Sequence, residues 1–283
     1  MKKLLLLLFI LFLIPFANAQ DIKLNGTISA ENNQIKNVSD PTEAQDAVTK
    51  AYIDALIATL QSQIDDLHPN SGYISYGDQV WTVKNAKMVT YRDGTPIPKV
   101  NNYQTWQNLT TGAWCYYNND ITKGKLYNWY AVMGIHDTNP NTPNKEFAPE
   151  GWHVPSDAEW TTLEEYLIAN GYNYDDATTG NTTTGNNIAK AMASTTGWNS
   201  STAAGAPGNA TSLNNSSNFN AFPEGYRDEY GNFNYEGSEA FFWSSDEDDF
   251  YEARFRYLFF SYSGLGRNHY YKQYGFSVRF VRD

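Results

Sequence analysis

Residues 151–160 (GWHVPSDAEW) encode a helix start, and this run constrains the fold more than any other part of the chain. Ser156 is followed three residues later by Glu159, which is the pattern of a capping box. In that motif the serine hydroxyl accepts a hydrogen bond from the third helical amide, and the carboxylate accepts one from the serine amide. The sequence therefore predicts a helix that begins directly after Ser156.

Apolar side chains continue from this start at helical spacing, at Trp160, Leu163 and Leu167. This spacing places them on one face of the helix, which we expect to be buried. Asn170 and Gly171 follow, and both residue types favour the left-handed conformation that ends many helices. We expect a short amphipathic helix with an aromatic-rich buried face.

Five segments stand in a distinctive order: residues 124–132 (GKLYNWYAV), 151–160 (GWHVPSDAEW), 219–227 (FNAFPEGYR), 242–245 (FWSS) and 275–281 (GFSVRFV). Together they resemble the Fibrobacter succinogenes major paralogous domain, over residues 76–283. The resemblance implies an α+β domain with a C-type-lectin-like fold. That fold is shared with formylglycine-generating enzymes and with the variable proteins of diversity-generating retroelements. The resemblance implies much less about function than about shape.

The first 19 residues have the three parts of a secretory signal peptide: the charged pair Lys2-Lys3, an apolar run over residues 4–16, and the small-residue site Ala17-Asn18-Ala19. We expect cleavage before Gln20. The alternative is an uncleaved anchor, whose apolar core would be too short to span a bilayer comfortably. No cysteine stands directly after the run, which excludes a lipoprotein anchor. We interpret the protein as exported, either secreted or on the cell surface, with no membrane span after cleavage.

Acidic residues outnumber basic ones, with 31 Asp and Glu against 20 Lys and Arg and a net charge of −11. Loss of Lys2 and Lys3 with the signal peptide leaves 18 basic against 31 acidic residues, a net charge of −13. Such a surface repels nucleic acid and anionic membranes. Cys115 is the only cysteine, so no intramolecular disulfide forms. It stands between Trp114 and Tyr116, and we expect a buried thiol rather than a reactive one.

The N-terminal part of the mature chain has the features of a stalk. Residues 20–45 are too polar to form a core alone, and we interpret them as an extended segment. Residues 35–54 resemble the repeat that joins strand to stalk in trimeric phage tail fibres, which implies a homotrimer. Residues 69–75 are the expected linker to the head. Over residues 46–68 the apolar side chains follow the 4-3-4-3 spacing of a coiled-coil helix: Ile53, Ile57, Leu60, Ile64 and Leu67. The alternative is a helix packed on the domain, because two heptads are marginal for an isolated coil.

Within residues 76–283, two segments have the alternation of strands, residues 79–83 and 276–281. The lectin-like resemblance implies that the first and last strands pair. Residues 175–218 are rich in Thr, Asn, Ser and Gly and predict a long surface loop with one helical turn near residues 188–192. We expect these large side chains to be buried: Trp81, Trp129, Trp152, Trp160, Leu163, Phe276 and Val278.

Catalytic and metal-binding patterns are weak. Residues 246–249 (DEDD) offer four carboxylates, but consecutive residues rarely reach one ion, so we interpret them as a solvated acidic turn. Residues 137–141 lack the glycine and distal glutamate of a calcium loop, which favours a turn. One cysteine does not supply the reactive pair of a formylglycine-generating enzyme. The four histidines show no metal-ligand spacing, and we expect no metal and no cofactor: His68, His136, His153 and His269.

Tyrosine and arginine crowd the stretch from residue 251 to residue 274, and both types are common in binding hot spots. On alternating strands about half of them would point inward, and the arginines would equally well pair with residues 246–249. The candidate ligand-binding residues are Tyr251, Arg254, Arg256, Tyr257, Tyr262, Arg267, Asn268, His269, Tyr270 and Tyr271.

The function that we favour from the sequence is binding or adhesion. A lectin-like head on an oligomeric stalk would recognise a glycan or a protein on a cell surface, and the stalk would multiply weak contacts. We assign no catalytic residue and expect no enzyme activity. Two alternatives stay open: a carbohydrate-active enzyme on the same fold, which needs two opposed carboxylates, and a purely structural fibre tip.

Overall fold

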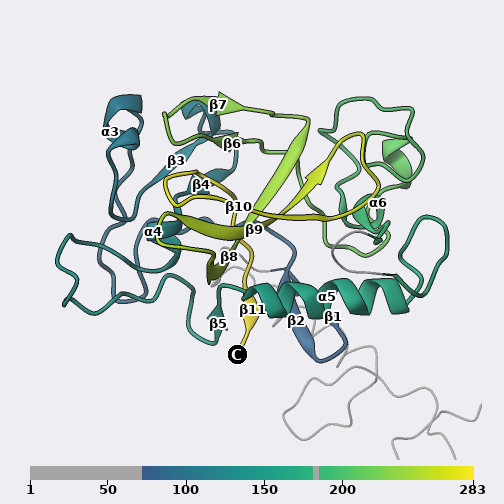
Figure 1. Ribbon diagram of the computed structural model, residues 1–283, viewed down its shortest axis with the longest axis horizontal. Coiled ribbons are helices and arrows are strands. Elements are labelled where there is room, and N and C mark those ends of the chain that lie inside the picture. Colours follow the sequence, from purple (N-terminus) through teal and green to yellow (C-terminus); the bar gives the residue numbers. More distant parts are fainter. Residues whose placement is uncertain (1–71, 181–184) are drawn as a thin grey trace, which may run out of the picture. The chain divides into compact units, whose positions relative to one another are not determined.

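The computed structural model describes residues 72–180 and 185–283. The signal peptide, extended segment and coiled-coil helix expected over residues 1–68 lie outside the described residues, as do linker residues 69–71. The expected linker extended to residue 75, but residues 73–75 belong to a strand, Tyr73–Tyr76, that pairs with the strand Gln79–Thr82. The described part is an α+β structure built from small antiparallel sheets and short helices (Figure 1). The α+β class predicted from the sequence is therefore confirmed.

The largest sheet of the described residues pairs the last strand with an early one. Val281 lies opposite Trp81, as expected for first and last strands that meet. This four-stranded sheet has the order β1 (Tyr73–Tyr76), β2 (Gln79–Thr82), β11 (Val281–Arg282), β5 (Trp152–His153). The three-stranded sheet has the order β10 (Gly266–Tyr271), β9 (Glu252–Phe259), β8 (Glu239–Glu247). Two strand pairs complete the β structure: β3 (Trp114–Tyr116) with β4 (Lys125–Tyr127), and β6 (Tyr226–Arg227) with β7 (Phe233–Asn234).

Helix α5 (Asp157–Ala169) begins where the sequence predicts it. The hydroxyl of Ser156 accepts a hydrogen bond from the Glu159 amide at 3.2 Å, and the Glu159 carboxylate accepts one from the Ser156 amide at 2.7 Å. Trp160, Leu163 and Leu167 are fully buried. The capping box and the apolar spacing thus fix this helix locally. The remaining helices are single turns or little more: α3 (Tyr103–Gln107), η1 (Tyr117–Asn119), α4 (Trp129–Val132), α6 (Ala189–Met192) and η2 (Thr211–Leu213).

His153 ties the start of α5 to the last residue of the chain. Its Nε2 lies 2.7 Å from Glu159 Oε1, and its Nδ1 lies 2.6 Å from Asp283 Oδ1. Burial opposes the charged imidazole, but hydrogen bonds to the two carboxylates raise the pKa of His153 above its ordinary value. The expectation of a hydrogen-bonded, structural histidine is confirmed.

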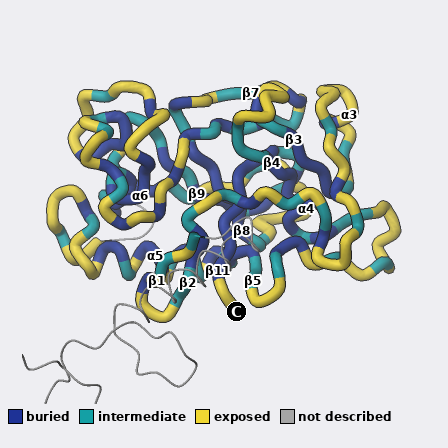
Figure 2. The backbone as a smooth tube through the Cα atoms, turned by 180° about the vertical axis from the view of Figure 1, so that it is seen from behind, coloured by how far each residue is buried: buried dark blue, intermediate teal, exposed yellow. Residues whose placement is uncertain are grey.

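The sheet β8–β10 separates two hydrophobic clusters. One cluster is built around Trp81, Trp160 and Phe242, with Trp160 4.7 Å from Trp81 and 5.8 Å from Phe242 between ring centroids. The other contains Trp243 and Phe276, whose ring centroids lie 4.3 Å apart. Burying each large side chain contributes about 1.5 to 3 kcal/mol. Buried β8 and β9 consequently lie at the centre, and exposed backbone is concentrated in the outer loops (Figure 2).

Residues 276–280 do not form the predicted strand. All six side chains of residues 276–281 are buried, the polar ones included. Single bridges join Phe276 to Tyr127 and Ser277 to Phe242, so the segment runs between sheets instead of extending one. The Arg279 guanidinium tolerates burial because it donates to three carbonyl oxygens and to one side-chain amide oxygen.

Trp152 is only partly buried, so its predicted burial is wrong. It lies on β5, at the edge of the four-stranded sheet, and an edge strand has a neighbour on one side only. Its ring lies 6.0 Å from the ring of Tyr73 and 4.9 Å from the guanidinium of Arg282. The other side chains expected in the core are buried.

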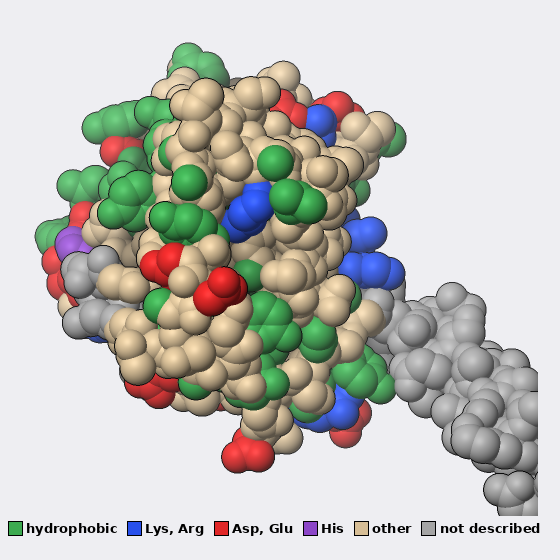
Figure 3. Space-filling model, turned by 90° about the vertical axis from the view of Figure 1, so that its right-hand side faces the viewer, with side chains coloured by type: hydrophobic (Ala, Val, Ile, Leu, Met, Phe, Trp, Pro, Cys, Tyr) green, Lys and Arg blue, Asp and Glu red, His purple; other side chains and the backbone are tan. Residues whose placement is uncertain are grey.

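Residues 185–218 contain the predicted helical turn as α6, and little other regular structure. Figure 3 views the side of the molecule that carries α6, where backbone and uncharged polar side chains predominate, with hydrophobic groups between them and few charged ones. The segment is nevertheless more than a surface loop, because Ile188, Met192 and Trp198 belong to the cluster around Trp160. At residues 137–141 the predicted turn is confirmed, since Asp137 and Asn139 each accept the amide two residues ahead.

Candidate functional site

The register of β9 and β10 sorts the candidate ligand residues onto two sides of the sheet. Residues directly opposite in an antiparallel pair point to the same side. Arg256 pairs with Arg267, and Arg254 pairs with His269. We name one side the arginine face, with Arg254, Arg256, Arg267, His269 and Tyr271. The opposite side carries Tyr257, Asn268 and Tyr270, whereas Tyr251 and Tyr262 lie outside the strands.

The arginine face packs on the first turn of α5. The buried carboxylate of Asp157 lies 2.6 Å from Arg256 and 3.4 Å from Arg254, and it also pairs with Arg267. Arg256 is fully buried and lies 2.5 Å from the buried carboxylate of Glu164. These ion pairs hold α5 against the sheet. They also correct the place of Arg256 among the candidates, because a fully buried and fully paired guanidinium has no surface for a ligand.

The acidic residues 246–249 are not simply solvated. Residues 247–249 are exposed, as the sequence interpretation requires, but every carboxylate of the four also has a protein partner. The partners are the amide of Asp157 for Asp246, Lys272 for Glu247, Arg254 for Asp248, and the amides of Tyr251 and Glu252 for Asp249. The turn is thereby fixed to β9, β10 and α5.

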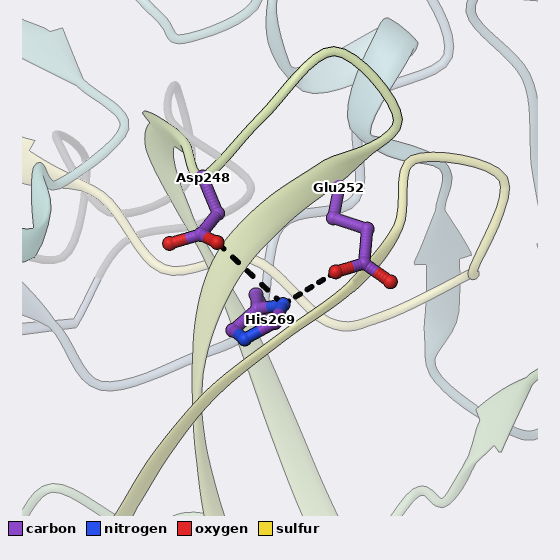
Figure 4. A group of neighbouring side chains, drawn as sticks. All are labelled: Asp248, Glu252 and His269. Carbon is purple, nitrogen blue, oxygen red and sulfur yellow. Dashed lines mark hydrogen bonds and ion pairs between the residues drawn. The ribbon is translucent and has the colours of Figure 1, made fainter.

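Asp248, Glu252 and His269 are the potential metal ligands that the described residues bring together, with one donor atom each and all within 4.8 Å of one another (Figure 4). Two carboxylates and an imidazole are a donor set that divalent cations accept. His269 Nδ1 lies 2.5 Å from Glu252 Oε2 and 3.6 Å from Asp248 Oδ2. The Arg254 guanidinium lies 3.1 Å from the other oxygen of Asp248 and competes with a cation. We interpret the group as an ion-pair cluster.

Six tyrosines cover the other side of the sheet and its rim. We call them the tyrosine face, and they are Tyr226, Tyr235, Tyr257, Tyr262, Tyr270 and Tyr274. The rings of Tyr270 and Tyr274 stack at 4.7 Å and 18°. Those of Tyr226 and Tyr235 stack at 5.7 Å and 21°, and Tyr226 lies 5.6 Å from Tyr274. The rings of Tyr235, Tyr226, Tyr274 and Tyr270 thus form one contiguous row.

Two carboxylates with unused acceptor capacity lie beside this row. Burial raises the pKa of Glu239 to about 7, and no described residue donates a hydrogen bond to its side chain. Burial is the main cause that raises the pKa of Tyr257 and Tyr270, and the negative charge of the neighbouring Glu239 raises it further. One carboxylate oxygen of Glu229 is buried without a hydrogen-bond partner among the described residues. Glu239 is available to a donor such as a hydroxyl, whereas the unpartnered oxygen of Glu229 is closed to solvent and its carboxylate interacts with Tyr274.

A hollow of about 310 Å³ lies at the end of the tyrosine face, lined in part by Tyr257, Phe259 and Tyr262. Tyr262 is 63 % exposed, so most of its ring is free for contact. A side chain at Gly266 would come within 2.2 Å of the Tyr257 ring, so glycine is needed for this ring to lie across β10. The hollow and the aromatic row together make the most favourable binding surface of the sheet.

Sequence reasoning did not select Tyr226, Tyr235, Glu229 or Glu239. They precede the Tyr- and Arg-rich stretch, and pairing of Arg227 with Gly275 and of Gly225 with Ala240 brings them to it. No local pattern marks these positions.

Cys115 is inert, as expected from its aromatic neighbours. It is fully buried on β3, and burial raises the pKa of its thiol to about 11. A thiol in this state is a poor nucleophile at neutral pH.

Small sheets around a buried three-stranded centre, with one capped helix packed against it, define an α+β domain with an aromatic surface. A family model, the Fibrobacter succinogenes major domain, matches residues 74–282, and the chain belongs to that family. Neither the curated proteins nor the solved structures include a significant match. Over residues 72–180 and 185–283, no helix combines the length and the apolar character that crossing a membrane requires.

Proposed function

We propose that this chain is an exported binding protein whose head, a C-type-lectin-like domain, recognises carbohydrate through the tyrosine face. The observation that carries the proposal is the row of stacked tyrosines beside Glu239, to whose carboxyl group no described residue donates a hydrogen bond. A sugar offers both complements, an apolar ring face for the aromatics and hydroxyl donors for the carboxyl group.

Two equally exposed tyrosines make a matched test. Tyr262 is 63 % exposed and lines the hollow, whereas Tyr251 is 64 % exposed and lies outside it. We expect Tyr262→Ala to weaken glycan binding at least about tenfold, the effect of losing an aromatic hot spot, with an unchanged melting temperature. Tyr251→Ala should bind like the parent. A glycan and protein array identifies the ligand, and calorimetry on the variants measures the loss. Equal losses in both variants would contradict the proposed surface.

The stalk belongs to the same proposal. We propose a signal peptide over residues 1–19 and a trimeric coiled coil over residues 46–68, which would multiply weak heads and raise avidity by ~10²-fold or more. Replacing Ile57 and Leu60 with Asp should give monomeric, folded heads in sedimentation experiments. A mature chain that is monomeric at micromolar concentration would refute the trimer.

Glu239 favours a second candidate, a carbohydrate-active enzyme on the same face. A carboxyl group whose pKa is raised to about 7 by burial has the character of a general acid for glycosidic bonds. Turnover of labelled polysaccharides separates the two: the enzyme predicts products, and Glu239→Gln should abolish their formation. If the array detects no ligand and no polysaccharide is turned over, the remaining alternative is a purely structural fibre tip.

A further inference from the structure

A second hollow, of about 370 Å³, shares no lining residue with the tyrosine face, and we call it the basic hollow. Three segments that are distant in sequence line it: residues 83–87 after β2, residues 121–125 leading into β4, and residues 220–224. Neither the binding proposal nor the ion pairs of the arginine face use any of these side chains. The hollow therefore needs an explanation of its own.

Positive charge is concentrated in the basic hollow. Lys84, Lys87 and Lys125 line it, and within residues 72–180 and 185–283 none of them has a carboxylate at ion-pair distance. Lys123 lines it too and pairs with Glu236 at its side. The whole chain has a net charge of −11, so lysines gathered at one place without a described carboxylate partner stand out. The local field attracts an anionic group.

The same hollow offers an acceptor and apolar contacts. One oxygen of Glu224 accepts the Gly124 amide at 3.0 Å, and the other has no donor among the described residues. Burial raises the pKa of Glu224 above its ordinary value. Phe222 and Ile121 line the hollow and are 37 % and 74 % exposed. A ligand with hydroxyl groups and one apolar face would satisfy both features.

We propose that the basic hollow binds an acidic sugar, with its carboxylate or sulfate group on Lys87 and Lys125, its hydroxyls on Glu224 and its ring against Phe222. Two kinds of acidic sugar fit this description, a uronic acid and a sulfated sugar. Both carry an anionic group on a hydroxylated ring. This site stands on different residues from the tyrosine face, and either can fail alone.

Lys99 provides a matched control for Lys125. Both ammonium groups lie over the rings of Trp114 and Tyr116, but only Lys125 lines the hollow. Binding is measured by calorimetry on the purified chain, with trigalacturonate, a sulfated galactotriose and neutral galactotriose as probes. We expect Lys125→Ala and Lys87→Ala each to weaken binding of the acidic probes about fivefold, as for one partly exposed ion pair, and Lys99→Ala to leave it within twofold.

The two acidic probes distinguish a carboxylate from a sulfate ester. Tyr262→Ala should leave both affinities unchanged, which separates this site from the tyrosine face. An equal loss in Lys99→Ala and Lys125→Ala would mean diffuse attraction and would overturn the site. Inorganic sulfate that displaces the saccharides at equal concentration would overturn the sugar as its ligand. Absence of binding of either acidic probe at millimolar concentration would overturn the proposal.

Discussion

The two sides of the sheet β8–β10 differ in composition, because charged side chains gather on one side and aromatic rings on the other. On the arginine face, the guanidinium groups of Arg254, Arg256 and Arg267 converge on Asp157 of α5. On the tyrosine face, rings stack on one another, while Glu239 and one oxygen of Glu229 have no donor among the described residues. Loss of one partner from a buried ion pair leaves an uncompensated charge in the interior, whereas a polar group without a partner near the surface can bind a ligand. The comparison assigns stability to one face and recognition to the other.

Removal of the Trp160 side chain should have the largest effect on stability, and it tests the packing of α5 against the arginine face. Trp160 is fully buried between α5 and the arginine side of the sheet, in contact with Phe242. Trp160→Ala should lower the free energy of unfolding by about 3 to 5 kcal/mol, because it leaves a large cavity. Denaturant unfolding measures the change. A variant that melts within a degree or two of the parent would break the assignment.

The arginine face itself is tested by comparing two of its ion pairs. Arg256→Met leaves the carboxylates of Asp157 and Glu164 buried without this partner, and should cost about 3 to 5 kcal/mol. Arg254→Met removes ion pairs with Asp157 and Asp248 from a side chain that is 36 % exposed, and should cost about 0 to 1 kcal/mol. Chemical denaturation of both variants gives the difference. Equal values would show that burial does not distinguish the two arginines.

The pH dependence of the free energy of unfolding tests the burial of Glu239 on the tyrosine face. Its pKa is about 7 in the folded chain against an ordinary 4.5, so the folded state holds its proton over a wider range. The stability from this group is complete below pH ~4.5 and is lost as pH rises to ~7, on the order of 1 kcal/mol after solvent screening. Glu239→Gln should remove that slope from a pH series of unfolding curves. The exposed Glu165→Gln serves as control, and an unchanged slope in Glu239→Gln would contradict the burial of Glu239.

Chelation should have the smallest effect of all. The donor group Asp248, Glu252 and His269 includes a member of the arginine face and already has Arg254 beside it. We therefore expect EDTA to leave glycan binding by the tyrosine face unchanged in calorimetry. Binding that is lost with EDTA, and restored by a divalent cation but not in His269→Ala, would assign a metal to this group.

Local chemistry made part of the fold predictable. Ser156 and Glu159 satisfy each other within four residues, so the start of α5 needed no tertiary information. Residues 276–280 were misassigned because neighbours distant in sequence pack on both sides of this segment. Odd and even positions are therefore both buried, and the alternation expected of a strand is not realised. Trp152 was misassigned because its place at a sheet edge depends on strand order, which composition does not reveal.

The sequence predicted which segment contains the candidate site, but not which side of its strands is exposed to a ligand. The abundance of Tyr and Arg correctly located β9 and β10, but the alternation of a strand does not say which side a helix will cover. The acidic first turn of α5 decided this, since Asp157 drew Arg254, Arg256 and Arg267 to its side. Tyr257 and Tyr270 are partly buried in ring contacts, so their joint loss with Arg267 should also destabilise the head.

The pairing of Val281 with Trp81 has a consequence for how the chain reaches its native state. Strand β11 supplies the centre of the sheet β1-β2-β11-β5, so this sheet stays incomplete until the last residues are available. Contacts between positions 81 and 281 close a very long loop, and topologies of this kind fold slowly. This sheet cannot be completed while the chain is still being made, which is compatible with translocation through a membrane before folding, as the proposed export requires.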